Sequence, residues 1–543
     1  MGGSRADTVL FGARVQTPGG ASESVAVRDG RIVAVGSRSD LEPLVDGTTE
    51  VLDLPGAMVV PGFQDVHVHP PSSGLERLRC DLHDVHGADA YVAAVGAYAQ
   101  SHPDAAWILG GGWSLDAFPR GTPHRSLLDA VVPDRPVFLP NRDGHGAWVN
   151  SVALRMAGIT RDTPDRPDGR IERDGDGEPW GVLHEGAMDL VKRLLPVTTL
   201  AEWEAALLEA QRHLHSLGIT AWQDAWVRPE NLETYIALAE DGRLTARVAG
   251  GLWWERDRGL GQIPDLLERR RRGTVGRLRC DTVKIMQDGI PENFTAGMLE
   301  PYLGAESRPA HQSGLSFVEP RALDEAVTRL DAEGFQVHFH AIGDRAVREC
   351  LDAVEAARRA NGPRDARHHI AHLQIVHPDD VPRFAALGVV ANIQAYWACL
   401  DDQMRELCLP ILGPDRAATQ YPFAALVRSG ARLAMGSDWS VTTADPLAQI
   451  QVAMTRVPED HPEREPFLPD ERLDLATCLD AFTLGSAFVN QLDDVTGTIE
   501  VGKLADLAVL DRDLFALAPE EVGSARCLMT VVEGEVVHRD PSV

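Results

Sequence analysis

Lysine is nearly absent from this 543-residue chain, although basic residues are not. Of 52 lysine and arginine residues only three are lysine: Lys192, Lys284 and Lys503. A lysine that remains inside an apolar strand invites a chemical explanation, because a buried amine can lose its proton and react whereas a guanidinium cannot. Lys284, in the sequence TVKIM, is such a lysine, and chance retention is the alternative.

Net positive charge and long apolar runs are also missing. The formal net charge of -29 argues against nucleic acid and anionic membrane surfaces as partners, since both require basic patches. No apolar run reaches the length of a membrane span, and residues 1–20 lack the basic start and apolar core of a secretion signal. Seven cysteines are scattered without a CxxC pair, which fits a reducing compartment better than a disulfide framework. We therefore expect a cytoplasmic protein with free thiols.

The middle of the chain alternates short apolar strands with helical segments, a pattern typical of βα units and a parallel sheet. Segments such as 201–217, 321–334 and 415–430 have the apolar spacing of helices and end at glycine. Eight strands, each followed by a helix, predict a (β/α)8 TIM barrel of the α/β class, with its active site at the C-terminal ends of the strands. The predicted strands are 59–67, 219–224, 246–253, 282–287, 335–340, 368–373, 389–394 and 432–438.

Hairpin signals at both ends of the chain predict a second domain. Asp29-Gly30 and Glu533-Gly534 each separate alternating runs, yet neither end could bury a sheet face alone. We expect residues 1–58 and 498–543 to pair into a discontinuous β-sandwich beside a barrel of residues 59–497. Residues 70–200, between the first two barrel strands, are too many for a loop. We interpret them as an inserted subdomain over the barrel mouth, with a separate domain elsewhere as the alternative.

Side chains that bind metal ions gather at the predicted strand ends. His67 and His69 are two residues apart on one strand and so project from the same face. Four further candidates end other strands: His338 or His340, then His372, and Asp438 after Gly436-Ser437. For each one the alternative is structural, namely a hydrogen-bonded histidine or an aspartate that caps the next helix.

The chemistry of this set is that of metal-assisted hydrolysis. His67, His69 and Asp438 can hold one divalent ion, and His340 with His372 a second. Lys284 can bridge them only after its amine reacts with CO2 to form a carbamate. Two cations then lower the pKa of a shared water, which supplies hydroxide at neutral pH. Asp438 would take the proton of that water during attack and deliver it to the leaving nitrogen.

These residues belong to motifs that resemble those of a known enzyme family. The motifs are Pro61-Gly62-Phe63 through His69, Gly112-Trp113, Asp143-Gly144-His145 with Asn150, Lys284 with Asp288-Gly289, His340 through Asp344, His372-Leu373-Gln374, Gly436 through Trp439, and Gly502 through Asp506. In combination they resemble the amidohydrolase superfamily, and within it amidohydrolase family 3, the YtcJ-like branch that includes N-substituted formamide deformylases. The resemblance covers nearly the whole chain.

The resemblance implies a barrel with a discontinuous β-sandwich and a metal centre, and it selects His340 over His338. The implied metal ligands are His67, His69, Lys284, His340, His372 and Asp438. His145 matches a family position in the inserted region, where it either donates to the substrate carbonyl or fixes the loop. The sequence departs from many relatives after Asp288-Gly289, and at Ser440, where proline is common.

Aromatic residues near the predicted strand ends, Trp113, Trp253, Phe294 and Trp439, either bind substrate or only pack. As substrate contacts they would favour an apolar or aromatic amide substituent. We therefore expect an amidohydrolase that cleaves a non-peptide carbon-nitrogen bond of a small amide, with one or two divalent ions per chain, zinc by default. A homodimer is plausible from the resemblance. The alternatives are a decarboxylase or isomerase on the same barrel, or a binding protein without catalysis.

Overall fold

A computed structural model describes residues 5–304 and 312–542 of the chain. The outermost residues of the two predicted terminal ranges, 1–4 and 543, therefore lie outside it. All seven cysteines are unpaired, as predicted. Among the described residues no helix is both long and apolar enough to cross a membrane.

The centre of the molecule is a parallel sheet in which eight strands follow one another in chain order, from β6 through β13 to β19. The strands are β6 (Phe63–Val68), β13 (Ile219–Val227), β14 (Arg247–Trp253), β15 (Leu278–Met286), β16 (Gln336–Ala341), β17 (His369–His372), β18 (Val390–Ile393) and β19 (Leu433–Met435). All eight predicted strands are present, which confirms the α/β TIM-type barrel. Some bounds differ: β15 begins four residues before the predicted start, and β19 ends three residues before the predicted end.

The sheet nearly closes where its first and last strands meet. Asp438 N donates to His67 O at 2.7 Å, and Ser437 N donates to Asp65 Oδ1 at 3.1 Å. Gly436 permits this approach, because a Cβ at that position would lie 2.6 Å from His67 N. The closure places Asp438 directly beside the two histidines of the first strand.

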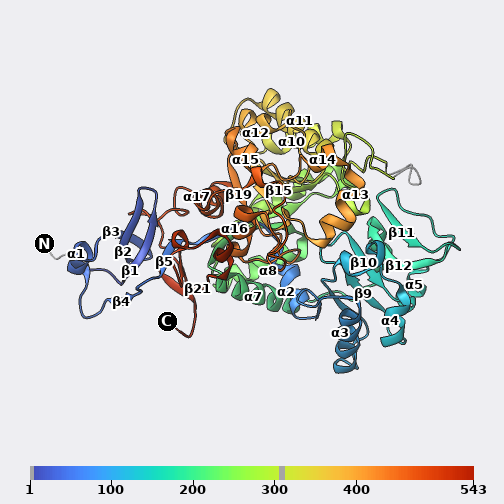
Figure 1. Cartoon of the computed structure of the whole chain (residues 1–543), viewed down its shortest axis with the longest axis horizontal. Helices are drawn as coiled ribbons and strands as arrows, with labels where there is room; N and C mark the ends of the chain where they lie inside the picture. Colours follow the sequence, from blue (N-terminus) through green and yellow to red (C-terminus); the bar gives the residue numbers. More distant parts are fainter. Residues whose placement is uncertain (1–4, 305–311, 543) are drawn as a thin grey trace.

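Helices surround the barrel (Figure 1). The apolar residues of α11, Val347, Cys350, Leu351 and Val354, recur at helical spacing and are buried. The predicted helix 415–430 is instead two short helices, because Pro422 between them cannot donate the hydrogen bond that a continuous helix requires. The helices near the barrel are α2 (Pro70–Arg77), α7 (Leu200–Ser216), α8 (Pro229–Glu240), α9 (Ile263–Arg272), α10 (Pro320–Ala332), α11 (Asp344–Asn361), α12 (Val381–Leu387), α13 (Leu409–Leu412), α14 (Pro414–Ala417), α15 (Phe423–Arg428), α16 (Pro446–Thr455), α17 (Leu475–Asp480) and α18 (Ser486–Val489).

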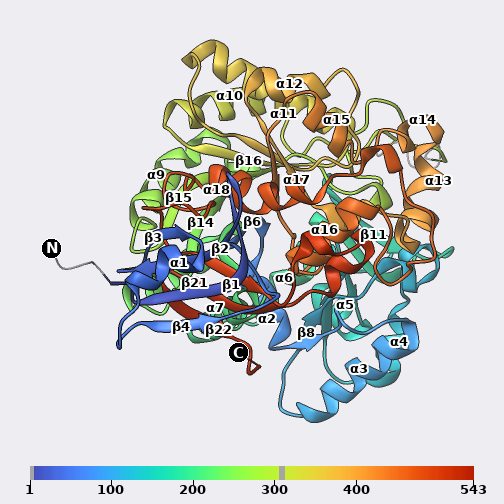
Figure 2. The ribbon, with the colours of Figure 1, turned by 60° about the vertical axis from the view of Figure 1, so that its left-hand side comes forward.

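Strands from the two ends of the chain share one sheet, shown in blue and red in Figure 2. The link is an antiparallel pair in which Val60 faces Ala508. Its strands are β1 (Thr8–Thr17), β2 (Gly20–Arg28), β3 (Arg31–Gly36), β4 (Glu50–Asp53), β5 (Met58–Pro61), β20 (Leu507–Leu510), β21 (Cys527–Val532) and β22 (Glu535–Arg539), with the short helix α1 (Arg38–Leu41). The proposed division of the chain into a β-sandwich, a barrel and an inserted subdomain stays a prediction.

The segment between β6 and β13 contains a six-stranded sheet of its own, in the order β11-β12-β10-β9-β8-β7. Its strands are β7 (Cys80–Asp81), β8 (Ile108–Gly111), β9 (Val137–Pro140), β10 (Gly146–Val149), β11 (Gly169–Arg173) and β12 (Pro179–Glu185). Its helices are α3 (Ala88–Ser101), α4 (Arg125–Val131), α5 (Ser151–Ala157) and α6 (Asp189–Lys192). Figure 1 shows this segment to one side of the barrel, away from the sheet of the chain ends.

Candidate metal centre

The C-terminal ends of the barrel strands bring together the six predicted metal ligands. His67 lies on β6, Lys284 on β15 and His340 on β16, His372 ends β17, and Asp438 follows β19. These five are all less than a tenth exposed, and His69, just beyond β6, is partly exposed. Burial of so many polar side chains at one place requires that their hydrogen-bonding atoms find partners.

Asp438 connects the two histidines of the first strand. Its Oδ1 lies 2.9 Å from His69 Nε2 and 3.2 Å from His67 Nε2. The three ligand atoms lie within 4.8 Å of one another, a spacing that one cation can bridge. Burial alone would raise the pKa of Asp438, but the hydrogen bond with His69, together with the proximity of His372 and Lys284, outweighs burial and lowers it. Asp438 is therefore an ionised carboxylate.

His372 lies between this group and His340. Its ring centroid is 4.7 Å from that of His67 and 4.4 Å from that of His340, and its Nδ1 is 4.0 Å from Asp438 Oδ2. Neither ring nitrogen of His372 has a hydrogen-bond partner among residues 5–304 and 312–542. His372 and Asp438 also have positive φ angles, 78° and 59°, which are costly for residues other than glycine and cluster at functional sites.

These unpaired nitrogens fit a metal ion. Burial lowers the pKa of His372 well below its ordinary value, so the ring is neutral and offers a lone pair. A buried ring without partners is costly unless something else occupies the lone pair. Neutral imidazole nitrogens beside a carboxylate form a donor set that Zn²⁺ and similar divalent ions bind.

Asp288, in the turn after β15, fixes the orientation of His340. Its Oδ1 is 3.2 Å from His340 Nδ1 and also accepts from Ile342 N, while Oδ2 accepts from Gly343 N and Gly297 N. With Nδ1 held, Nε2 is the nitrogen of His340 that remains for a metal ion. Asp288 is therefore a supporting group for His340.

Lys284 reaches the cluster through a histidine. Its Nζ lies 3.3 Å from His338 Nε2, and this Nε2 atom of His338 lies 2.9 Å from His67 Nδ1. No carboxylate within the described part of the chain forms an ion pair with Lys284. Burial lowers the pKa of Lys284 to about 7, so a large share of its amine is neutral near physiological pH. His338 thus contacts both Lys284 and His67.

His145, in the segment between β6 and β13, also reaches this site. Its ring centroid is 5.6 Å from that of His340, and its Nδ1 lies 3.0 and 3.1 Å from the two carboxylate oxygens of Glu185. Burial alone would lower the pKa of His145, but the Glu185 carboxylate outweighs it and raises this pKa to about 9.

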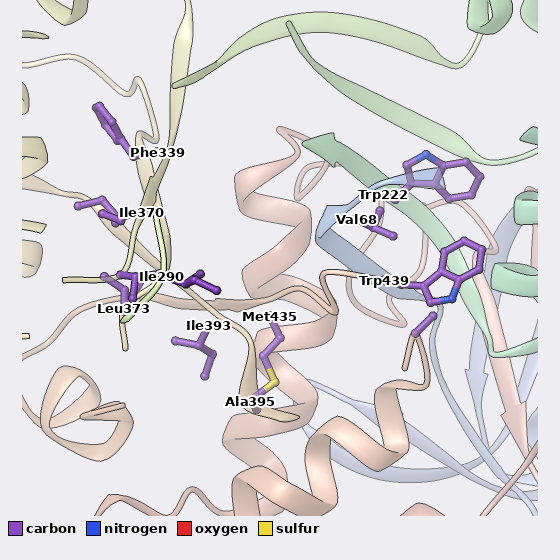
Figure 3. Close-up of a cluster of buried hydrophobic side chains, with 14 of the residues drawn as sticks. Val68, Trp222, Ile290, Phe339, Ile370, Leu373, Ile393, Ala395, Met435 and Trp439 are labelled. Atoms are coloured by element: carbon purple, nitrogen blue, oxygen red, sulfur yellow. The ribbon is translucent and has the colours of Figure 1, made fainter. Parts of the chain in front are cut away.

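A cavity of about 590 Å³ opens beside the cluster. Trp439 lines it next to Asp438, and Trp397 lines it while stacking on His372 with a centroid distance of 5.1 Å. Figure 3 shows Trp439 at the edge of the large buried apolar cluster that also contains Val68 and Trp222. The lining carries more carboxylates, among them Glu292, than arginines.

The structure places the other three predicted aromatic contacts elsewhere. Trp113 is fully buried, donates through Nε1 to Leu139 O and packs against Trp148. Trp253 contacts Trp226, and Phe294 contacts Tyr302. The described residues that line the cavity do not include any of these three side chains. Their side chains pack against other aromatic rings, the alternative that the sequence left open.

Two supporting carboxylates were not predicted from the sequence. Asp65 is fully buried and accepts from His67 N at 3.0 Å as well as from Ser437 N and Oγ, so it ties the first strand to the turn that carries Asp438. Glu185 holds His145. Asp65 shares the strand parity of His67, which was a usable signal, whereas Glu185 is recognised only from the pairing of β12 with β10, which brings it to His145.

Comparison with known proteins places the chain in a family. The model described as "Amidohydrolase family" matches residues 50–538. The protein LONG AFTER FAR-RED 3 of Arabidopsis thaliana is 33% identical over 95% of this chain and 88% of its own length. The putative amidohydrolase YtcJ of Bacillus subtilis is 29% identical over 96% of both chains, and the N-substituted formamide deformylase of Arthrobacter pascens is 27% identical over 97% of both.

A solved structure of similar shape is an uncharacterized metal-dependent hydrolase from Pyrococcus furiosus. It has a TM-score of 0.71 and 26% identity and covers 93% of this chain and 99% of its own. The family model matches most of the chain, and the histidines, Lys284 and Asp438 of the sequence motifs lie together at the ends of the barrel strands. The chain belongs to the amidohydrolase family.

Proposed function

We propose that this protein is a metal-dependent hydrolase that cleaves a non-peptide carbon-nitrogen bond of a small amide. The observation that carries the proposal is the pair of unpartnered nitrogens of buried His372, set between Asp438 and His340. Membership of the amidohydrolase family and the metal-dependent hydrolase from P. furiosus support it.

His67, His69 and Asp438 would hold one divalent ion, and His340 with His372 would hold a second or complete the first. A bound divalent ion polarises a carbonyl and lowers the pKa of water. Zinc suits the nitrogen and carboxylate donors. Lys284 would supply oxygen ligands as a carbamate, formed when its neutral amine attacks CO2 and releases a proton. Its burial, its lowered pKa and its lack of a carboxylate partner among the described residues favour that reaction.

Proton transfer, carbonyl binding and shielding of the site are assigned to protein side chains. Asp438 accepts the proton of the attacking water and passes it to the leaving nitrogen, since it is ionised and faces both histidines of β6. His145 donates a hydrogen bond to the carbonyl oxygen as negative charge develops there. Trp397 and Trp439 shield the reacting groups from the outer cavity.

A panel of N-formyl, N-acetyl and N-carbamoyl amines tests the proposal. Zinc-loaded protein is incubated with each compound, and released primary amine is measured by fluorescamine. We expect release from at least one class, and its loss in an Asp438→Asn protein that remains folded. No amine from any compound, or equal release by Asp438→Asn, would contradict the proposal. Release of CO2 without amine would indicate a decarboxylase instead.

A further inference from the structure

Glu185 occupies an unusual position for a residue that only stabilises the fold. It is the last residue of β12, it is 7% exposed, and both of its carboxylate oxygens contact His145 Nδ1. Its backbone has φ 50° and ψ −130°, a conformation that L-residues rarely adopt. Such strain persists only where the surrounding structure enforces it, and it concentrates at functional sites.

The loop after β15 is built around this carboxylate. Thr295 Oγ1 donates to Glu185 Oε1 at 2.8 Å, and Asn293 Nδ2 donates to His145 O at 3.1 Å. Gly289 leaves the room that these groups require, because a Cβ there would lie 2.5 Å from Glu185 Oε1 and 2.2 Å from Thr295 Oγ1. The loop that follows the strand of Lys284 therefore fixes the pair from the barrel side.

We propose that Glu185 is a positioning residue that holds His145 by Nδ1, so that Nε2 is presented to the carbonyl oxygen of a substrate bound beside His340. The proposal rests on the proposed function and deepens it, since it assigns recognition of the reacting carbonyl to a pair of residues outside the barrel strands. Glu185 itself touches no substrate. The imidazole ring of His145 has two nitrogens in either protonation state. The Glu185 carboxylate occupies Nδ1, which leaves Nε2 for the substrate.

A neighbouring pair offers a matched control. Glu172 lies 3.6 Å from His184 Nε2 and also pairs with Arg170 at 3.0 Å. It sits on β11, which pairs with β12, yet no contact joins it to His145 among the residues that the structure describes. Glu172→Gln therefore removes a similar charge from the same sheet without disturbing His145.

The first test measures ligand binding and does not depend on catalytic turnover. Acetohydroxamate, which carries a carbonyl and chelates metal ions, is titrated calorimetrically into the zinc-loaded protein. Glu185→Ala and His145→Asn should each weaken binding about 10- to 100-fold, the usual range for a partner that orients a ligand-binding histidine. The double variant should bind no more weakly than His145→Asn alone, because Glu185 acts only through His145. Glu172→Gln should bind as the wild type does.

Additive losses in the double variant, wild-type affinity in Glu185→Ala, or no binding to the wild type would each overturn the inference. Proton NMR gives a second readout that a general loss of stability would not produce. The hydrogen-bonded Nδ1 proton of His145 should give a downfield signal that Glu185→Ala and Gly289→Ala abolish and Glu185→Gln, which keeps an acceptor oxygen, retains. Persistence of that signal in Glu185→Ala would contradict the inference.

The two proposals fail separately. If the hydroxamate and NMR results are as expected and no amide is hydrolysed, the positioning role stands and the proposed function is wrong. If an amide is hydrolysed and Glu185→Ala behaves as the wild type does in both assays, the proposed function stands and the positioning role is wrong. Zinc content and thermal unfolding of each variant show that the compared proteins are folded and loaded.

Discussion

Replacing Glu292 by glutamine should stabilise the protein at high pH and leave it unchanged at low pH. Glu292 lines the cavity beside other carboxylates, and Gln403 Nε2 donates to its Oε1 at 3.2 Å. Burial, with Asp143 adding repulsion, raises the pKa of Glu292 to about 7 from an ordinary 4.5. This raised pKa corresponds to about 3 kcal/mol, since each pKa unit is worth 1.36 kcal/mol. Because the side chain is partly exposed, we expect about 1 to 3 kcal/mol.

The sign follows from the raised pKa. Below pH 4.5 both the folded and the unfolded chain carry a protonated Glu292, and the wild type keeps its full stability. Between pH 4.5 and 7 the unfolded chain ionises Glu292 while the folded chain keeps it protonated, so stability falls over this range and the loss is complete above pH 7. Glutamine has the same shape and keeps an acceptor oxygen for Gln403, but it cannot ionise.

Urea unfolding at pH 4 and pH 8 measures the effect. The free energy of unfolding of Glu292→Gln should exceed that of the wild type at pH 8 and match it at pH 4. Glu300→Gln, at an exposed glutamate nearby, controls for the general effect of removing one negative charge. A difference that does not depend on pH, or one that the control reproduces, would refute this electrostatic account of the cavity.

Three further predictions concern the metal centre. Asp288→Asn should weaken zinc binding about 10- to 100-fold in a chelator competition, because it disturbs the contact that orients His340. Asp344→Asn is the control. It alters backbone contacts at the start of α11 and should leave zinc binding unchanged. Removing metal with a chelator should lower the melting temperature, and free zinc at 1,000 times its Kd should restore about 4 kcal/mol of stability in calorimetry. Asp438→Asn should lower kcat about 100- to 10,000-fold on any amide that the wild type hydrolyses, and an unchanged kcat would exclude Asp438 as the proton carrier.

The barrel was predictable because its strands are short apolar runs separated by helical patterns, and strand parity alone placed His67 and His69 on one face. His372 and Asp438 were predictable as strand-end residues. Trp113 was not, since an aromatic residue after a glycine run has the same sequence whether it lines a cavity or packs against Trp148. The sheet of residues 80–185 was missed because its strands are short and separated by glycine and proline. The role of Glu185 was not predictable, because it depends on contacts with His145 and Thr295, which lie 40 and 110 residues away in the chain.

Metal content per folded chain tests the central claim most directly. It would be measured by plasma mass spectrometry on the wild type, His372→Ala and Lys284→Ala after identical zinc loading. We expect at least one equivalent in the wild type and less in both variants, with about two equivalents in the wild type if a Lys284 carbamate bridges a pair of ions. A wild type without bound metal, or a His372→Ala protein that binds as much as the wild type, would contradict the account.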